Sequence, residues 1–459
     1  LHSDTRLLGL FVSHYLGALL KLFGTQGSED SYRIDAATRS WGLALAAAQA
    51  GLQLLARRLA SRPGPPPRPA PALRRGAVLV ALALVGVVGA EKTLYARAEV
   101  TLDRQLTATS QLLPLYPRLS VVQLLPESVR EQLPVLPTVR LGEEPQPLDW
   151  PRAMPELPAD GPRPDIVVLV VDSWRADALD ERVTPRLEAL AREARRFDDH
   201  LSSGNGTRFG VFGMLYGLHG SYWWSVLAER RSPVLMDVLL EEGYEVRVFS
   251  AASQDFPEFR STAWARWPGA VVDEFAAARQ CARDEQLADA CIAWWRERAA
   301  SGRRRPAFTF VLLDSAHQTY DFPDGRAPFQ PYAEELDYFE MSRSHAPELA
   351  LRVRNRYLNA LHHADAVAGR LVDELERLGS DDDTLLVVTG DHGEEFAENG
   401  FWGHTGNFTP EQIAVPLLLR GPGVEPGVEQ RPTTHLDLAP TLLELLGADP
   451  ARAGSWCLG

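Results

Sequence analysis

Two carboxylates and an imidazole follow apolar runs of the sequence and have the chemistry of metal ligands. Asp172 comes directly after the run IVVLVV, and Asp391 and His392 come after LLVVTG within the string GDHGE. If both runs are strands of a parallel sheet, their carboxyl ends meet at the edge where ligands bind. Mixed oxygen and nitrogen ligands suit zinc or manganese better than calcium. A strand-end aspartate often only caps the next helix, but an adjacent Asp and His followed by Gly is a more specific signal.

A hydroxyl follows a polar loop in the string SSGNGTRFGVFGMLYGLHG. Thr207 ends the loop, and Arg208 opens an apolar run with helical spacing. A threonine at a helix start is usually an N-cap, although the same geometry also favours a phosphate or sulfate group. The hydroxyl is a weak nucleophile at neutral pH unless a base or metal lowers its pKa. A cation held by the strand-end residues could supply that activation and polarise the ester oxygen.

The order of these residues resembles the alkaline phosphatase/sulfatase superfamily. The resemblance covers essentially all of residues 165–459, including THLDLAPTLLELLG near the end. It implies that Asp172, Asp391 and His392 are metal ligands and that Thr207 is both the nucleophile and a contact of the metal. It implies one divalent ion, whether manganese, zinc or magnesium, and leaves a second ion open.

The same resemblance assigns residues to the substrate. His404, in FWGHTGNF, matches a ligand of the substrate anion. His317, in LLDSAHQTYDFP, falls where such enzymes place another ligand of the substrate or of a second metal, and Asp314 lies beside it. Arg208, next to the nucleophile, is the fourth residue that we expect to bind substrate.

The sequence departs from true sulfatases at the nucleophile. Those enzymes carry a Cys or Ser in a C/S-x-P-x-R string that matures to formylglycine. None of Cys281, Cys291 and Cys457 lies in such a context. Hydrolysis of sulfate esters is therefore disfavoured. Threonine nucleophiles occur in the phosphoethanolamine transferases, lipoteichoic-acid synthases and phosphodiesterase-like members of the superfamily.

Within the superfamily the chain is most similar to the PbgA/YejM family. The likeness rests on SSGNGTRFGVFGMLYGLHGSYWW and on the upstream stretch HYLGALLKLFGT. It implies a Gram-negative inner-membrane protein with five spans and a periplasmic sulfatase-like domain, of which this chain lacks three spans and part of the C-terminus. The implied partners are membrane lipids, either lipid A or phospholipid headgroups, and an inner-membrane regulatory protein.

Two hypotheses of different class follow. One is a metal-dependent phosphoester hydrolase or headgroup transferase that acts on envelope lipids. The other is a catalytically inactive sensor of lipid A that regulates lipopolysaccharide synthesis.

The elements that must position these residues alternate as in an α/β domain. Short apolar, β-branched runs separated by helical patterns predict a mostly parallel sheet flanked by helices, as in alkaline phosphatases. The predicted strands are Ile166–Val171, Val246–Phe249, Phe308–Leu313, Leu385–Val388 and Val415–Leu419. The predicted helices are Pro185–Arg195, Pro233–Glu242, Glu285–Arg298 and Val353–Leu378.

The region before the predicted domain has the pattern of a membrane hairpin. The uncharged stretches 40–56 and 76–90 flank the segment 57–75, which contains arginines and no acidic residue. This arrangement matches the positive-inside rule, although each stretch is short for a span and two buried helices are the alternative. We expect spans at about 38–58 and 74–95, preceded by an interfacial helix at about 7–24.

The expected domain organisation follows from these segments. Residues 1–95 form the membrane region, 96–164 a juxtamembrane segment with a proline-rich linker, and 165–459 a periplasmic domain. Prolines concentrated between 114 and 164 disfavour regular helix there.

Composition excludes some function classes. With 47 basic and 61 acidic residues the chain has a net charge of −14, which is a poor match for nucleic acid. Three cysteines cannot form a disulfide framework, and a Cys281–Cys291 bridge, which would require Asp284 to cap a helix that starts after Cys281, stays open.

Other residues receive structural interpretations. We expect His362 and His363 to be structural, Asp365 to lie on the helix surface or form a local hydrogen bond, and Trp294 and Trp295 to pack in the core.

Overall fold

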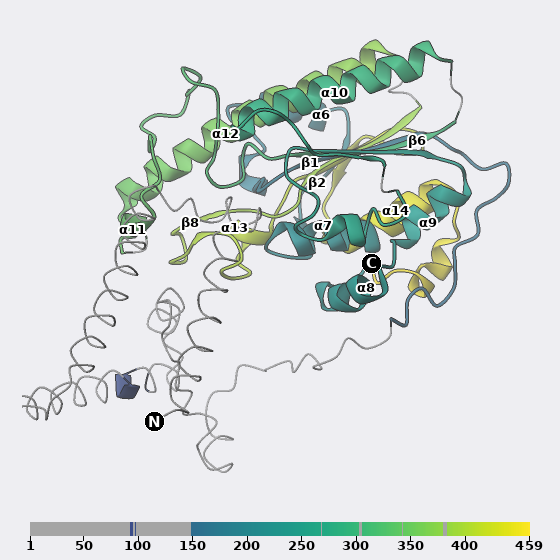
Figure 1. Cartoon of the computed structure of the whole chain (residues 1–459), viewed down its shortest axis with the longest axis horizontal. Helices are drawn as coiled ribbons and strands as arrows, with labels where there is room; N and C mark the ends of the chain where they lie inside the picture. The colour runs from purple at the N-terminus through teal and green to yellow at the C-terminus, as the bar shows by residue number, and fades with distance from the viewer. Residues whose placement is uncertain are drawn as a thin grey trace, which may run out of the picture. The chain divides into compact units, whose positions relative to one another are not determined.

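The structure is a computed structural model of the 459-residue chain. It describes residues 148–267, 269–302, 305–341, 343–379 and 383–459, together with residues 92–94 and 97. The fold lies in residues 148–459 and is shown in Figure 1.

An eight-stranded mixed sheet forms the centre of the domain. Every neighbouring pair is parallel except the two pairs that β10 makes, with β2 and with β7. In spatial order the strands are β11 (Gly427–Glu429), β2 (Arg195–Phe197), β10 (Leu417–Arg420), β7 (Thr384–Gly390), β1 (Asp165–Val171), β6 (Ala307–Leu313), β4 (Glu245–Ser250) and β5 (Val271–Val272).

Helices cover both faces of this sheet, as Figure 1 shows. The central strand β1 sends Ile166, Val168 and Val170 into one core and Val167, Leu169 and Val171 into the other. Burial on both faces explains why the strand is a continuous apolar run rather than an alternating one. The first core lies under α7 (Thr207–Tyr216), α8 (Trp223–Glu229), α9 (Val234–Glu241) and α14 (Leu438–Leu445). The second lies under α6 (Pro185–Ala191), α10 (Gln280–Ala300) and α12 (Pro347–Arg377).

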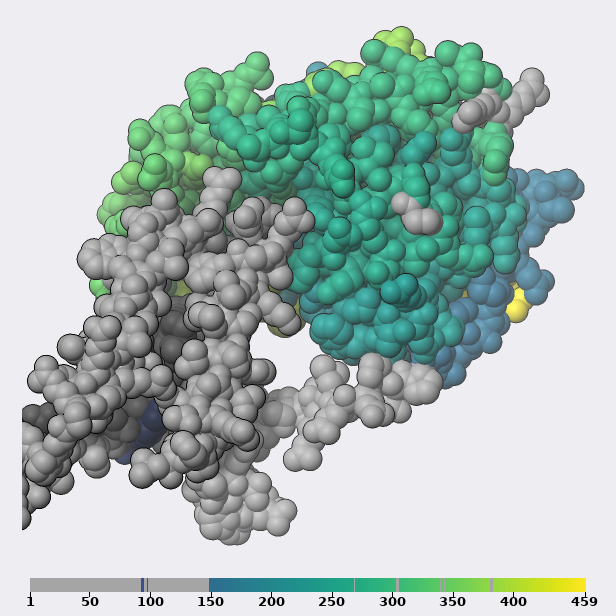
Figure 2. Space-filling view, viewed as in Figure 1, coloured from purple at the N-terminus to yellow at the C-terminus, as the bar shows by residue number. Residues whose placement is uncertain are grey.

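Smaller elements complete the domain. In the space-filling view its teal and green surfaces adjoin without a break (Figure 2). Two short ladders pair β3 (His200–Leu201) with β12 (Thr433–Thr434) and β8 (Glu395–Phe396) with β9 (Trp402–Gly403). The short helices are α11 (Tyr338–Met341), α13 (Pro410–Ile413), η3 (Ala176–Ala178), η4 (Gly220–Tyr222), η5 (Phe259–Ser261), η6 (His435–Asp437) and η7 (Pro450–Ser455).

The predicted α/β architecture is confirmed, and the differences lie at the ends of elements. All five predicted strands and all four predicted helices are present. The helix predicted to end at Arg195 stops at Ala191, because Arg195 begins β2. The last predicted strand runs antiparallel to its neighbours, which makes the mostly parallel sheet a mixed one.

The predicted membrane region falls outside the described residues, apart from 92–94, which are helical. Within the described part of the chain, no helix has both the length and the apolar character needed to span a bilayer.

The predicted linker is described only at residue 97 and from Leu148 onward. Residues 148–164 contain no helix or strand, yet Trp150 is buried in the first core and Arg152 N donates to Ser455 O at 2.8 Å. The end of the predicted linker therefore packs against the domain.

The position at which α10 starts decides whether Cys281 and Cys291 can form a disulfide. The helix begins at Gln280 with Arg279 as its N-cap residue, so Cys281 and Cys291 lie in one helix and both are free. The suggested cap by Asp284 is wrong. This carboxylate is fully buried inside the helix and accepts hydrogen bonds from Asp314 N and Ser315 N at 2.8 and 2.9 Å.

The residues interpreted as structural make specific contacts. His362 Nδ1 lies 3.0 Å from Val183 O and His363 Nε2 lies 3.2 Å from Cys281 O. Asp365 is not on the surface: it is buried and accepts from Arg186 N and Leu187 N at 3.0 and 2.8 Å. These amides belong to the first turn of α6, so a side chain of α12 satisfies the N-terminus of another helix.

Asp365→Ala should lower the free energy of unfolding by about 1–3 kcal/mol, because two backbone amides lose their acceptor. The matched control is Asp373→Ala, which removes the exposed ion-pair partner of Arg186 on the same helix. An exposed pair contributes less than about 1 kcal/mol. Urea denaturation compares the two, and equal losses would contradict the role assigned to Asp365.

Candidate active site

The ends of β1 and β7 bring the predicted metal ligands together. The two strands are parallel neighbours, and Val171 pairs with Gly390, so the residues that follow them, Asp172 and Asp391, leave the sheet side by side. His392 Nε2 lies 3.7 Å from Asp172 Oδ1 and 3.5 Å from Asp391 Oδ2. All three side chains are almost completely buried, and their ligand atoms lie within 4.8 Å of one another.

Thr207 joins this group from α7. Its hydroxyl lies 3.4 Å from Asp172 Oδ2 and 3.3 Å from His392 Nε2. Gly206, not Thr207, is the N-cap residue, and no side chain caps the helix. The structural alternative for Thr207, an N-cap, therefore does not apply, and its hydroxyl faces the carboxylates.

Close packing at a glycine places α7 against the loop that contains Asp391. A Cβ on Gly210 would stand only 2.0 Å from Asp391 O, and His435 Nδ1 lies 3.1 Å from Gly210 O. Ser202 Oγ donates to the same Asp391 carbonyl at 2.5 Å. The glycine of the GTRFG string is thus required for backbone contact.

The turn after β1 is held in an uncommon conformation. Ser173 has φ 59°, in the left-handed region that side chains disfavour. In this conformation its amide donates to Asp391 Oδ1 at 3.0 Å and its hydroxyl donates to Asp172 Oδ1 at 2.7 Å. Tyr357 OH donates to Ser173 O at 2.7 Å and helps to hold the turn. Ser173 thereby fixes both carboxylates.

The donor set fits a divalent cation. His392 Nδ1 lies 2.8 Å from Gly393 O, to which it donates, so the lone pair of Nε2 faces the two aspartates. Asp391 Oδ1 accepts from two amides, whereas Asp391 Oδ2 is buried without a hydrogen-bond partner among the described residues. A buried carboxylate oxygen without a partner is costly. A cation held by Asp172, Asp391, His392 and the Thr207 hydroxyl would satisfy it.

The pKa values of Asp391 and His392 also indicate that negative charge is crowded in this site. Burial raises the pKa of Asp391 to about 6, and the neighbouring charge of Asp172 adds to the rise. Burial by itself would lower the pKa of His392, but the carboxylates of Asp391 and Asp172 outweigh it and the pKa is raised. Two carboxylates in a dry site repel one another, and positive charge between them relieves the repulsion.

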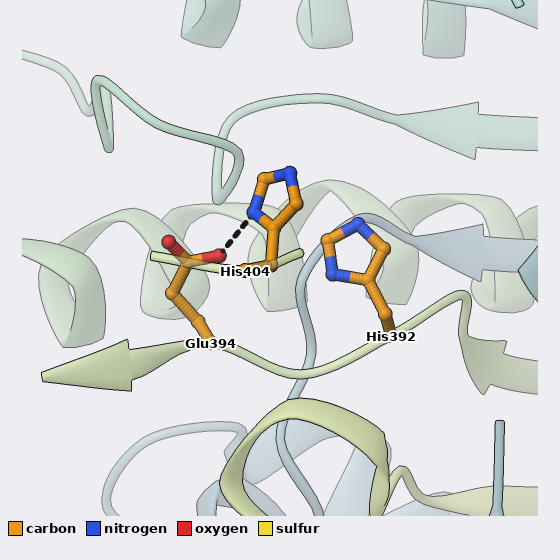
Figure 3. Close-up of side chains that lie close together, drawn as sticks. All are labelled: His392, Glu394 and His404. Atoms are coloured by element: carbon orange, nitrogen blue, oxygen red, sulfur yellow. Dashed lines mark hydrogen bonds and ion pairs between the residues drawn. The ribbon is translucent and has the colours of Figure 1, made fainter. Parts of the chain in front are cut away.

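A second group of side chains adjoins the first and contains the predicted substrate ligand His404 (Figure 3). Its Nδ1 lies 2.8 Å from Glu394 Oε2, and its ring centroid lies 4.2 Å from that of His392. Glu394 also accepts from Tyr320 OH at 2.6 Å. Burial alone would raise the pKa of Glu394, but the charge of His404 and these hydrogen bonds lower it to about 2. Glu394, His392 and His404 also lie close enough together to hold a metal.

The predicted pair His317 and Asp314 also lies near His404. The ring centroids of His317 and His404 are 5.4 Å apart, and His317 Nδ1 lies 3.9 Å from Asp314 Oδ1. Burial acts to lower the pKa of His317, but the carboxylates of Asp172, Asp314, Glu394 and Asp391 raise it to about 9. Arg283 Nη2 donates to Asp314 Oδ2 at 2.8 Å.

Arg208 makes its contacts elsewhere. Its Nη2 donates to Glu258 Oε2 at 3.0 Å, and its guanidinium lies against the rings of Trp223, Trp224 and Phe256. The structure therefore brings Thr207, Asp172, Asp391, His392, His404 and His317 towards one centre but holds the Arg208 side chain in an aromatic cluster.

Three supporting residues were missed at the sequence level. Glu394 lies within the GDHGEE string itself, and a buried acid so close to a metal ligand is a signal that sequence reasoning could have used. Ser173 directly follows Asp172 but has no distinctive pattern. Asp284, which holds the backbone of Asp314 and Ser315, is masked by the ordinary helical pattern of α10.

The chain matches the model of a known protein family. The sulfatase family matches residues 164–448 of the chain. Because this match covers more than half of the chain, the chain belongs to the sulfatase family.

Individual relatives show which members of the family the chain resembles. The chain is 24% identical over 288 residues to the inner membrane protein YejM of Salmonella typhi, a match that covers 61% of this chain and 41% of that protein. It is 37% identical over 108 residues to a choline-sulfatase of Rhizobium meliloti, covering 24% of this chain and 21% of the enzyme. The matched part thus spans well under half the length of either relative. The resemblance to the superfamily and to the PbgA/YejM family predicted from sequence is confirmed.

A solved structure supports the fold. The lipoteichoic acid synthase LtaP of Listeria monocytogenes superposes with a TM-score of 0.50 at 15% identity, over 64% of this chain and 76% of that chain. The alkaline-phosphatase-like fold expected from the sequence is the fold observed.

Asp391→Ala should abolish stoichiometric metal binding, because it removes a charged ligand and leaves Asp172 and His392 alone. The loss of affinity should exceed the roughly 10–100-fold cost of removing an outer-shell partner. His362→Ala, which removes a histidine bonded to Val183 O, should leave the metal content unchanged. Elemental analysis after dialysis measures both; dependence on His362 rather than Asp391 would overturn the assignment.

Gly210→Ala should destabilise the domain by about 1–3 kcal/mol, the usual range for overpacking, because its Cβ cannot fit beside Asp391 O. It should also weaken metal binding by displacing α7. Gly454→Ala is the control, since nothing lies within 4 Å of the Cβ it would add. Thermal denaturation and metal titration test the pair, and an unaltered Gly210→Ala protein would contradict this packing.

Proposed function

We propose that the domain is a metal-dependent phosphoester hydrolase or headgroup transferase that acts on lipids of the bacterial envelope. The observation that carries the proposal is the position of the Thr207 hydroxyl, 3.4 Å from Asp172 Oδ2 and 3.3 Å from His392 Nε2, beside the unpartnered Asp391 Oδ2. A threonine with only a structural role does not need to lie beside two buried carboxylates, whose burial is unfavourable.

The proposed roles follow from the contacts. Asp172, Asp391, His392 and Thr207 hold the cation, which when bound lowers the pKa of the hydroxyl and polarises the ester oxygen. As the Thr207 oxygen forms a bond to phosphorus, its proton would pass to Asp172 Oδ2, 3.4 Å away. The bond from phosphorus to the leaving oxygen would break at the same time, and that oxygen would take up a proton from water and depart as the alcohol.

The imidazoles receive the anionic part of the substrate. His404 is fixed through Nδ1 by Glu394, which leaves Nε2 as the nitrogen available to a substrate oxygen. His317, whose ring centroid lies 5.4 Å from that of His404, adds a second imidazole next to it. If water attacks the phosphorus of the phosphorylated Thr207 and frees the threonine, the domain is a hydrolase. If a second alcohol attacks instead, the domain is a transferase.

A phosphoester is favoured over a sulfate ester by the nucleophile. The site presents a threonine, and the chain's three cysteines are all buried, with Cys281 and Cys291 in α10 and Cys457 against the Tyr216 carbonyl. None of them has the sequence context that leads to formylglycine.

The envelope location draws on two independent supports. The relative YejM is an inner membrane protein, and stretches 40–56 and 76–90 flank a basic segment in the way expected of a membrane hairpin. On this basis we place the chain in the inner membrane with residues 165–459 in the periplasm.

Thr207→Ala should reduce turnover of a phosphodiester by orders of magnitude while the domain stays folded, because it removes the nucleophile and no helix cap. Thr207→Ser, which keeps the hydroxyl, should retain part of the activity. Rates with p-nitrophenyl phosphodiesters, together with the far-UV circular dichroism of each variant, test this.

The sensor hypothesis predicts a different outcome. A lipid A sensor without turnover would allow Thr207→Ala to complement a strain that lacks the protein. Full complementation combined with no phosphoesterase activity in the parent chain would overturn the enzyme proposal.

A further inference from the structure

An exposed aromatic surface lies next to the nucleophile, and the proposed chemistry does not use it. Phe256 and Trp224 are 58% and 45% exposed. The guanidinium carbon of Arg208 lies 5.0 Å from the centroid of the Phe256 ring and 5.6 Å from that of Trp224. We call Arg208, Trp224 and Phe256 the rim cluster.

Core packing does not account for these two rings. The neighbouring Trp223 does the packing: it is fully buried and makes edge contacts with Phe212 and Phe259 at centroid distances of 5.6 and 5.7 Å. Trp224 and Phe256 instead come from segments more than thirty positions apart in the sequence and are gathered around one cation. Large exposed aromatics gathered at one place are typical of binding surfaces.

The charge of the cluster argues against a second anion site. Arg208 is paired with Glu258 at 3.0 Å and covered by three aromatic rings, so its charge is already balanced. Its Nε is buried without a hydrogen-bond partner among the described residues. Arg208 therefore acts as the support on which the rings lie, and its expected part in substrate binding stays a prediction.

The cluster is tied to the nucleophile by the chain itself. Arg208 is the residue after Thr207 in the first turn of α7, and α8, which carries Trp224, lies beside α7 in Figure 1. The residue that carries the hydroxyl and the residue that supports the rings are therefore consecutive on one helix, which motivates a test of whether a chain esterified to a phosphate at Thr207 extends to the rim cluster.

We propose that the rim cluster is an apolar subsite that binds the hydrocarbon part of a phosphoester substrate and selects lipids over small soluble esters. This inference rests on the proposed function, since it assumes that phosphate is bound at Thr207. It specifies the substrate class: the group beside the phosphate carries an alkyl or acyl chain with no charge of its own near the rings.

The test compares two esters with the same leaving group, octyl p-nitrophenyl phosphate and methyl p-nitrophenyl phosphate, both below any micelle concentration. The full chain should prefer the octyl ester in kcat/KM. Trp224→Ala and Phe256→Ala should each raise KM for the octyl ester by about tenfold, roughly the effect of uncovering two methylene groups. Both variants should leave the methyl ester unchanged.

The control is Val428→Ala, which shortens a side chain that is 51% exposed on β11 at the edge of the sheet. It should alter neither ester. Equal losses on both esters in the rim variants, or no preference for the octyl ester in the parent chain, would overturn the subsite.

A binding experiment separates failure of the subsite from failure of the proposed function. Calorimetry with Thr207→Ala compares octyl phosphate with methyl phosphate and needs no turnover. Tighter binding of octyl phosphate that is lost in Trp224→Ala supports the subsite even if the parent chain hydrolyses neither ester. If the rim variants lose only sedimentation with phosphatidylglycerol vesicles and keep the preference for octyl phosphate, the surface contacts a bilayer and the subsite proposal is wrong.

Discussion

The repulsion between Asp172 and Asp391 is the interaction on which the site depends. The two carboxylates follow neighbouring parallel strands whose register pairs Val171 with Gly390, so the fold itself forces them together. Both are buried, and only part of their hydrogen-bonding capacity is met by Ser173 and by backbone amides. A soluble domain gains nothing in stability from such a pair. Its presence is understandable if positive charge is bound there, and the geometry of His392 and Thr207 then follows.

The rigid parts of the fold hold this unfavourable arrangement in place. Strands β1 and β7 are buried on both faces and cannot move apart without exposing both cores. From the other side, Gly210 allows α7 to touch the Asp391 carbonyl, and His435 in η6 bonds to the Gly210 carbonyl. Backbone packing of α7 thus positions Thr207, the proposed nucleophile, while the contacts of its hydroxyl with Asp172 and His392 are long, at 3.4 and 3.3 Å.

The sequence predicts correctly which residues meet at the edge of the sheet. That Asp172, Asp391 and His392 lie together was predictable because continuous apolar runs identify buried strands, and parallel strands present their carboxyl ends together. The roles of Asp284 and Asp365 were not predictable. Each satisfies amides of a segment remote in sequence, at Asp314 or at Arg186, and helical periodicity carries no information about such partners. Arg208 is the converse case: its place beside Thr207 suggested a substrate ligand, but aromatic neighbours from later segments determine where the side chain goes.

Two adjoining groups of side chains make up the site. Asp172, Asp391 and His392 offer oxygen and nitrogen atoms beside the Thr207 hydroxyl, and His404 adjoins them with its ring centroid 4.2 Å from that of His392 and 5.4 Å from that of His317. Glu394 fixes His404, and Tyr320 in turn fixes Glu394, with no exposed side chain needed for support. In the reaction proposed above, a phosphoester would turn its charged oxygens towards the cation and the imidazoles. Because Arg208 follows Thr207 in the first turn of α7, the helix that carries the proposed nucleophile also carries the support of the exposed rings Trp224 and Phe256, and the proposed function and the proposed subsite thus depend on the placement of one helix.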